Sequence, residues 1–426
     1  MLKRLFHSSF VRNVVLVATG TAGAQAITMA FSPIITRLYG PEAFGLLGTF
    51  TAVLAILMPI AALTYPIAIV LPKRDDDARA IAKLSLQLAV VISLITAAVF
   101  LMGDRALAQL LGLQTISSFL LLIPLAMLFN AMQQVMQQWL IRKKEFKVSA
   151  RIAVSQSLIL NSTKAGVGPF YPAGAALILL ATLGNALYAA QLWFGARRWS
   201  NVNDHINQVQ DELPKAKTVA YQHRDFPIYR MPQVMINSFS QSIPVLVLAG
   251  VFGPATAGFY TLSRTVMSAP AQLLGKSVGN VFYAQIAELV NAGKDPRRYL
   301  YRATVGAFLV AVIPFSIVMV WGVPLFKLVF GAEWSVAGEY ARWVALWMLF
   351  SLAARPAIAI IPVINAQGWF LRSEIVFTVL KVTAILLGAL VLKNALYAVA
   401  LYASISTIFY IYLYIFLINR MMFNFI

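Results

Sequence analysis

Long apolar stretches constrain this chain more than any other feature of its sequence. A helix needs roughly 20 such residues to cross a bilayer. The stretches that approach or exceed this length are 14–35, 44–71, 84–102, 116–140 and, with one lysine inside it, 375–392. Sixty per cent of the residues are hydrophobic and only 12% are charged, whereas a soluble domain carries roughly twice that charged fraction. The sequence therefore predicts an all-α polytopic membrane protein.

The N-terminus resembles a secretory signal peptide, because the basic start MLKRLF is followed by an apolar stretch and the small residues AGAQA. The apolar run continues to Ile35, however, which is too long for a signal peptide, so we interpret it as the first spanning helix. The chain has no cysteine, and its three histidines fall in polar segments outside the predicted spans. These features argue against disulfides, thiolate chemistry and a buried metal site. We therefore expect no enzymatic activity, no cofactor and no metal.

Charged residues, prolines and glycines divide the chain into twelve candidate spans. They are 13–36, 44–71, 80–103, 116–140, 148–168, 172–196, 226–252, 256–287, 300–323, 337–365, 373–392 and 395–419. One long polar insertion follows the sixth span. We therefore expect an N-terminal six-helix lobe at 1–196, a cytoplasmic linker at 197–225 and a C-terminal six-helix lobe at 226–426.

Lysine and arginine predict the orientation of these spans. With the N-terminus inside, most of the 34 basic residues fall in or beside cytoplasmic segments, and only Arg37, Arg105, Lys327 and Lys393 fall in outer loops. The positive-inside rule thus predicts a multi-pass membrane protein with both termini in the cytoplasm. Most of the net charge of +19 follows from this bias, and the basic loops would lie against membrane lipids. Nothing in their spacing indicates a partner nucleic acid.

A Gly-Pro turn recurs about half a chain length apart. Residues 40–47 are GPEAFGLL and join the first two spans, while residues 253–260 are GPATAGFY and join the seventh and eighth. A second echo is WLIR at the end of the fourth span and WFLR after the tenth. Two echoes at equivalent places favour duplication over chance. Each lobe has six spans, an even number, so both lobes would enter the membrane from the same side. They would then be parallel repeats, which commonly surround a central substrate cavity that opens alternately to the two sides of the membrane.

Basic residues inside the predicted spans are the main candidates for a binding site. A charge at mid-bilayer costs about 2.5–3.5 kcal/mol, so such residues usually pair or face water. No aspartate or glutamate falls at a predicted span centre, which leaves an anion from outside as the expected partner. These basic residues are Lys164, Arg230, Arg264, Lys276, Arg342, Arg355 and Lys381.

Polar residues accompany the cations at helical spacing on spans one, seven and eight. On the eighth span they recur every four residues from Arg264 to Asn280, and on the seventh they begin at Arg230. Spans one and seven are equivalent in the two lobes, as are two and eight, so these faces could line one cavity. The candidate substrate-binding residues are Arg264, Lys276, Arg355, Lys381, Lys164, Arg230, Gln25, Asn237 and Gln272.

Each candidate also has a purely structural interpretation. Arg230 and Arg342 lie near span ends, where they could anchor the helix to headgroups, and Lys164 and Lys381 could bind backbone carbonyls. Glutamines between 133 and 138 could join helices.

A cationic cavity predicts an anionic substrate, since guanidinium matches phosphate with two hydrogen bonds and lysine acts as a point charge. No intramembrane carboxylate offers a proton relay, so membrane potential, a counter-ion or product consumption could drive transport.

Three segments carry a resemblance to a known family. They are SPIITRLYGPEAFG (32–45), GNVFYAQIAELVNAGK (279–294) and PLFKLVFGAEWSVAGEYAR (324–342). They resemble the bacterial polysaccharide-transport flippases, the Wzx-type lipid-linked oligosaccharide translocases of the multidrug/oligosaccharidyl-lipid/polysaccharide exporter superfamily. The resemblance implies a protein of the bacterial inner membrane that translocates undecaprenyl-pyrophosphate-linked oligosaccharide units from the cytoplasmic to the outer leaflet, for O-antigen, capsule or exopolysaccharide biosynthesis. Candidate further partners are the polysaccharide polymerase and the chain-length machinery.

Two departures from related families favour this branch. Peptidoglycan-precursor flippases usually have two further helices, and drug-exporting relatives commonly carry an acidic residue in the first helix, where this chain has threonine, glutamine and serine. A cation-coupled drug exporter of the same superfamily stays an alternative. A membrane glycan polymerase or glycosyltransferase is another, although the predicted outer loops are short for a catalytic site. The glycan itself stays open.

Overall fold

The structure is a computed structural model that describes residues 9–110, 114–203, 216–270, 297–361, 364 and 366–424. Within these residues the chain is helical, without strands. Seven of the described helices are long and apolar enough to cross a membrane, and one of them, Thr19–Ala61, is broken at Gly40 and covers two expected spans. The prediction of an all-α, multi-pass membrane protein is confirmed.

The backbone contacts divide the chain into two compact units. The first comprises Met1–Tyr39 and Leu46–Ser242, and the second Gly40–Gly45 and Ile243–Ile426. This boundary falls inside helix α8 (Met231–Phe252), whereas the lobe boundary at residue 226 stays a prediction from the sequence. Within the described residues, the expected linker holds the end of helix α6 and a short helix α7.

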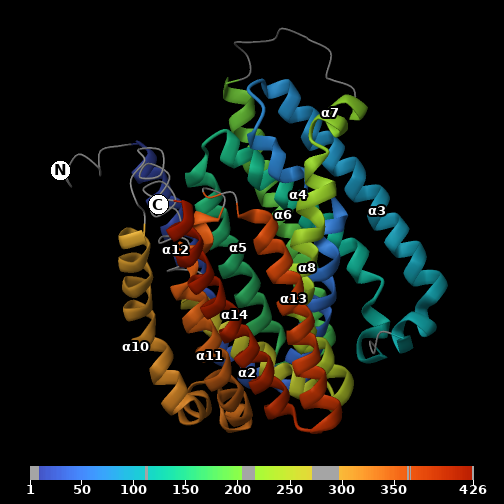
Figure 1. Cartoon of the computed structure of the whole chain (residues 1–426). Coiled ribbons are helices and arrows are strands. Elements are labelled where there is room, and N and C mark those ends of the chain that lie inside the picture. Colours follow the sequence, from blue (N-terminus) through green and yellow to red (C-terminus); the bar gives the residue numbers. More distant parts are fainter. Residues whose placement is uncertain are drawn as a thin grey trace. The chain divides into compact units, whose positions relative to one another are not determined.

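The first unit is built on four long helices and on parts of two others, α2 and α8. Helix α4 packs against α3 and α6, and α5 packs against α6 (Figure 1). The interior includes Tyr65, Ile69, Ile81 and Val135. The elements are α2 (Ser9–Ala61), α3 (Asp75–Leu110), α4 (Leu122–Arg142), α5 (Phe146–Val167), α6 (Gly174–Asn203) and α7 (Ala216–Gln222).

The second predicted span ends earlier than expected. Helix α2 stops at Ala61, and Tyr65–Val70 forms a separate 3₁₀ turn. Leu63 and Thr64 adopt positive φ, and Pro66 disfavours helical geometry in the residue before it. The apolar run to residue 71 is therefore continuous in hydropathy but not in backbone conformation.

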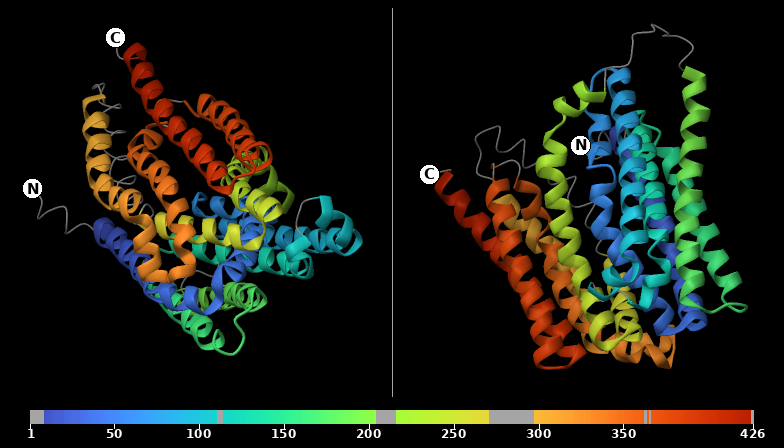
Figure 2. Two further views of the ribbon diagram at one scale, coloured as in Figure 1. Left: turned by 90° about the horizontal axis from the view of Figure 1, so that it is seen from below. Right: turned by 90° about the vertical axis from the view of Figure 1, so that its right-hand side faces the viewer.

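In the second unit, helix α14 lies beside α11 and α13, and α10 lies beside α11 (Figure 2). The interior where α12, α13 and α14 meet includes Ile360, Phe409 and Leu413. Helix α13 continues as a π-helix to Val391. The elements are a helix at 254–270, α10 (Arg297–Phe330), α11 (Ser335–Ala353), α12 (Arg355–Ile360), α13 (Gln367–Leu386) and α14 (Ala395–Asn424).

The tenth predicted span, 337–365, is not one continuous helix. Helix α11 ends at Ala353 and the short helix α12 begins at Arg355, with Pro356 in its first turn. Proline cannot donate to the preceding turn and its ring clashes with that turn, so it interrupts a helix but is tolerated at the start of one. The break places Arg355 at a helix start rather than in a helix interior.

Both Gly-Pro motifs begin a helix in the same way. Gly40 has φ 65° and Gly253 has φ 90°, a left-handed region that glycine enters without steric cost. A proline follows each glycine at the start of the next helix, where its missing N–H is not needed. The repeated sequence thus encodes one repeated helix–turn–helix geometry.

The two motifs also pack on each other within the second unit. Gly45 contacts Pro254, and Gly258 contacts Pro41, each so closely that an added Cβ would overlap the carbonyl oxygen of the proline. The contact is reciprocal, because the last glycine of one motif meets the first turn of the other. The pattern Gly-Pro-x-x-x-Gly is therefore needed for the packing as well as for the turn.

Candidate functional site

Three of the predicted cations meet aromatic residues on one helix of the second unit. Two of the aromatic residues are adjacent on α14 and follow the third by seven and eight positions, which brings all three to one side of that helix. We call this arrangement the α14 cation row. It comprises Arg264 with Tyr402 and Arg355 with Tyr410, which interact electrostatically, and Lys381 with Phe409, whose ring centroid lies 4.8 Å from Nζ.

Arg264 is half-buried on the helix at 254–270. It interacts electrostatically with Tyr260 and Tyr402, which are only 1% and 3% exposed. A tyrosine is uncharged at neutral pH, so these two contacts bring no opposite charge to the guanidinium. The position suits recognition of a negative group.

Arg355 is exposed and opens helix α12 at the break after α11. It interacts electrostatically with Tyr410, whose hydroxyl shares a hydrogen bond with the side chain of Ser351 on α11. Irregular backbone at membrane depth is tolerated where it is buried in protein or lines water. A helix break that carries an exposed arginine is therefore a plausible place for a polar substrate group to bind.

Glu374 is a buried carboxylate that the sequence-based expectation missed. It is 7% exposed and lies seven residues into α13, about 10 Å from the helix start at 1.5 Å per residue. It interacts electrostatically with Lys381 and Tyr410. The expectation that only an anion from outside would accompany the cations is therefore wrong for Lys381.

The physical reason for that error is the position of a helix end. Helix α13 begins at Gln367 rather than at residue 373, so Glu374 is six residues further into the helix than predicted. A signal was present in the sequence, because Glu374 and Lys381 are seven residues apart and so lie on one face of a helix.

The remaining described candidates belong to the first unit and do not gather at one point. Lys164 is half-buried in the last turn of α5, and its carbonyl accepts a 2.9 Å hydrogen bond from the hydroxyl of Tyr39. Arg230 is exposed and donates to Gln233 over 3.0 Å. Gln25 is half-buried on α2. Their assignment to a binding site stays a prediction.

Asn237 is exposed on α8 and accepts a 2.6 Å hydrogen bond from Gln241, one turn further along. These two residues and the Arg230–Gln233 pair follow one another at helical spacing, as the sequence predicts for this span. Lys276 and Gln272 lie outside the described residues. Among the residues that the structure describes, no three histidine, cysteine or acidic side chains cluster as a metal site would require.

Part of the polar face of the first span joins helices. The Thr28 hydroxyl lies 3.0 Å from that of Ser157 on α5, and Ser157 donates to the Ala24 carbonyl over 2.7 Å. Gln133 likewise donates over 2.8 Å to the carbonyl of Asn185 on α6. The structural interpretation of the glutamines is confirmed for Gln133, and it also applies to Thr28.

Comparison with known sequences gives two matches. A family model described as polysaccharide biosynthesis protein matches residues 34–339. The succinoglycan biosynthesis transport protein ExoT of Rhizobium meliloti (strain 1021) is 25% identical over 346 residues, which cover 79% of this chain. The match spans only 65% of the length of that relative.

Comparison with solved structures shows a shared fold. The lipid II flippase MurJ in an inward closed conformation superposes with a TM-score of 0.73, covering 96% of this chain and 90% of that chain at 11% identity. An inward-facing multidrug resistance MATE family transporter of the MOP superfamily gives a TM-score of 0.62, with coverages of 93% and 94% at 13% identity. At such identities the likeness concerns architecture alone.

Proposed function

This chain belongs to the polysaccharide biosynthesis protein family, and from that membership we propose that it translocates a lipid-linked oligosaccharide across the bacterial inner membrane. The substrate is an oligosaccharide repeat unit on undecaprenyl pyrophosphate, moved from the cytoplasmic to the outer leaflet by alternating access. Both termini face the cytoplasm. Support comes from a relative named as a transport protein and from the fold shared with a structure titled as a flippase.

The observation that carries this proposal is the α14 cation row. A pyrophosphate presents several anionic oxygens, and arginine can bind two of them at once, whereas lysine offers a point charge. Arg264 and Arg355 supply two guanidinium groups along one face of α14, and Lys381 supplies an ammonium group. The three groups match the charge and the hydrogen-bonding capacity of a pyrophosphate.

Glu374 gives the row a means of releasing its ligand. The carboxylate interacts electrostatically with Lys381. An arriving pyrophosphate competes with Glu374 for that ammonium group, and the carboxylate recovers it when the substrate leaves. A competition of this kind lowers the net affinity, which transport requires because a ligand held too tightly is not released.

Translocation in proteoliposomes tests the proposal. Wild-type protein and Arg264→Gln are reconstituted with a lipid-linked oligosaccharide, and the glycan that becomes accessible to an external glycosidase is measured over time. We expect the variant to be at least about tenfold slower, because a charge-assisted bidentate contact contributes about 2 kcal/mol. Arg298→Gln serves as the matched control, since Arg298 is exposed at the start of α10.

Each result decides a separate point. Equal rates for wild type and Arg264→Gln would remove Arg264 from the substrate site. A wild-type protein that moves none of the lipid-linked glycans tested would contradict the proposed function itself.

Export of cationic drugs is the second candidate function. It is favoured by the buried carboxylate of Glu374 and by the fold shared with a structure titled as a multidrug resistance transporter. It ranks second because Lys381 lies close to that carboxylate and would repel a cationic drug. Energy-dependent efflux of a cationic dye that is lost in Glu374→Gln would favour this candidate over the first.

A further inference from the structure

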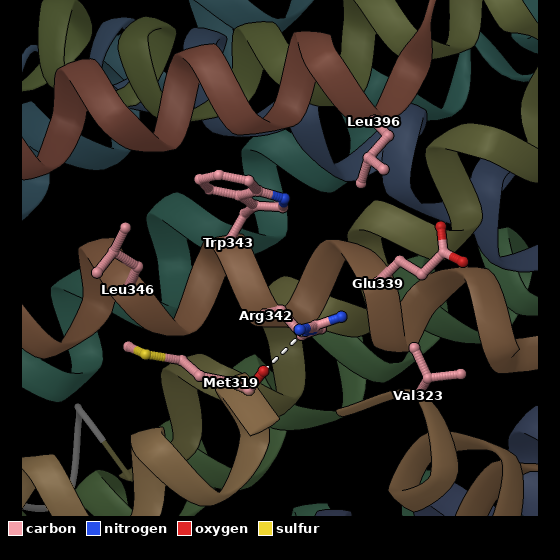
Figure 3. A pocket seen from close by; sticks show the side chains of 7 residues that line it. All are labelled: Met319, Val323, Glu339, Arg342, Trp343, Leu346 and Leu396. Carbon is pink, nitrogen blue, oxygen red and sulfur yellow. Dashed lines mark hydrogen bonds between the residues drawn. The ribbon is translucent and has the colours of Figure 1, made fainter. Parts of the chain in front are cut away.

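A pocket of about 490 Å³ lies in the second unit, apart from the α14 cation row. It is formed by the last third of α10, the first half of α11 and the first turn of α14 (Figure 3). Its volume falls within the range usual for small-molecule sites. The lining residues are Met319, Val323, Glu339, Arg342, Trp343, Leu346 and Leu396.

The backbone geometry of α10 accounts for the position of the charged groups. The helix bends at Trp321, which has φ −107° and ψ 19°, and Pro324 follows. Just beyond the bend, Gly322 meets Gly338 of α11, and a Cβ on Gly338 would lie 2.6 Å from the Gly322 carbonyl oxygen. The two helices touch there with no room for side chains, so Arg342, one turn further along α11, extends to the exposed side.

A hydrogen bond holds Arg342 in this position. Its Nε donates over 2.7 Å to the carbonyl of Met319, near the bend, as the dashed line in Figure 3 marks. The guanidinium group has five N–H donors, so the bond leaves its terminal nitrogens for another partner. Among the residues that the structure describes, neither Arg342 nor Glu339 takes part in an ion pair within 4.0 Å.

The pocket combines one cation, one anion and an apolar wall. Glu339 and Arg342 are three residues apart on α11, which places their Cβ atoms about 5–6 Å from each other on one face. The other lining residues are apolar, and Trp343 adds an indole ring. A ligand that complements this pocket needs an anionic group for Arg342, a cationic group for Glu339 and a hydrocarbon portion for the apolar residues.

Exposed apolar side chains on α10 indicate that the helix faces lipid near the pocket. Trp321, between the lining residues Met319 and Val323, is 56% exposed, and Leu328, further along the helix, is 74% exposed. Tryptophan is enriched at the level of the headgroups. With the predicted orientation, these helix ends face the outer leaflet.

We propose that this pocket binds a zwitterionic phospholipid with a primary ammonium, namely phosphatidylethanolamine, from the surrounding leaflet. Arg342 binds the phosphate through its terminal nitrogens, and Glu339 accepts hydrogen bonds from the ammonium group. The acyl chains run along Met319, Val323 and Leu346. A net anionic headgroup is disfavoured, because the carboxylate of Glu339 faces the same space and would repel the added charge.

This assignment uses only the pocket and does not rest on the proposed transport function. The lipids retained by the purified protein are measured by native mass spectrometry after exchange into mixed micelles. The micelles hold equal amounts of phosphatidylethanolamine, phosphatidylcholine and phosphatidylglycerol. Wild type is expected to retain phosphatidylethanolamine about tenfold over each of the other two.

Two variants separate the contributions of the two charges. Glu339→Gln is expected to lose the preference over phosphatidylcholine, whose quaternary ammonium has no N–H to donate, while still binding phosphate. Arg342→Gln is expected to reduce retention of all three lipids by about tenfold. Leu396→Trp fills the pocket without changing its charges and should also reduce retention of all three lipids. It serves as the test of the pocket if Arg342→Gln does not fold.

Arg298→Gln is the control outside the pocket and should match wild type. Equal retention of the three lipids by wild type would overturn the assignment, as would a preference for phosphatidylglycerol. Unchanged retention in both Glu339→Gln and Leu396→Trp would also overturn it, because the bound lipid would then lie elsewhere.

Discussion

Gly45 and Gly258 show how single atoms decide the packing of the second unit. Each closes a Gly-Pro motif, and each faces the carbonyl oxygen of a proline in the other motif. Substitution of either glycine by alanine is expected to lower the free energy of unfolding by about 2 kcal/mol or more, because the new methyl group must displace backbone. The midpoint of thermal unfolding in detergent measures the effect.

Gly306 provides the matched control in the same unit. It lies inside α10 with no atom within 4 Å of an added Cβ. Alanine is the better helix former by about 1 kcal/mol, so Gly306→Ala should leave the midpoint unchanged or raise it. If all three variants behaved alike, the close contact between the motifs would not be what constrains the glycines.

The residues of the site were predictable only where a charge stood out against an apolar background. Arg264 could be identified because it interrupts an apolar span, and the structure places it beside buried tyrosines. Glu374 was missed, since its depth depends on a helix end that hydropathy does not define. The pairing of Arg342 with the Met319 carbonyl was not predictable either, because it follows from a backbone bend.

At the scale of elements, one ion-pair cluster joins the end of α4 to the start of α3. Arg142 donates from Nε to Asp75 over 2.8 Å and from a terminal nitrogen to the Pro72 carbonyl over 2.7 Å. Lys143 Nζ lies 2.6 Å from the second oxygen of Asp75. The side chain of Arg142 is only 9% exposed, so its guanidinium group is largely buried between the two helix ends.

Asp75→Asn is therefore expected to lower the free energy of unfolding by about 1–2 kcal/mol, because a largely buried guanidinium loses its anion. The estimate is below that for a fully buried pair, since Asp75 itself is 42% exposed. Chemical denaturation in detergent, followed by tryptophan fluorescence, measures the change.

The neighbouring Asp76→Asn is the control. Asp76 lies 3.8 Å from Arg74 and 3.5 Å from Arg79, whose side chains are 61% and 43% exposed. Surface pairs of this kind contribute at most about 1 kcal/mol. A loss for Asp76→Asn as large as that for Asp75→Asn would show that general surface charge, rather than the buried cluster, stabilises these helix ends.

Hydropathy predicted which helices exist more reliably than it predicted where each helix ends. The described helices cover all twelve predicted spans at least in part, but α2 stops early at Ala61 and the tenth span breaks before Arg355. Backbone conformation at prolines decides both ends. The two similar segments also occupy different positions in their helices. WLIR ends α4, whereas WFLR lies in the first turns of α13.

At the scale of the whole molecule, the sequence repeat and the two compact units divide the chain differently, because residues 40–45 of the first Gly-Pro motif belong to the second unit. The Gly-Pro motif occurs once in each half of the chain, and the chain divides into two units of helices. The family model places the chain among polysaccharide biosynthesis proteins, and its fold is shared with the solved structure of MurJ. The composition could predict the membrane, whereas in our proposal the choice of substrate depends on a few side chains of the second unit.

The central claim is that the α14 cation row holds a pyrophosphate, and binding tests it most directly. The dissociation constant of the purified protein for undecaprenyl pyrophosphate is measured beside that for undecaprenyl monophosphate. Wild type should bind the pyrophosphate at least about tenfold more tightly, and Arg264→Gln or Arg355→Gln should each weaken that binding about tenfold, with Arg298→Gln unchanged. Equal dissociation constants for the two lipids, or no change in either arginine variant, would contradict the account.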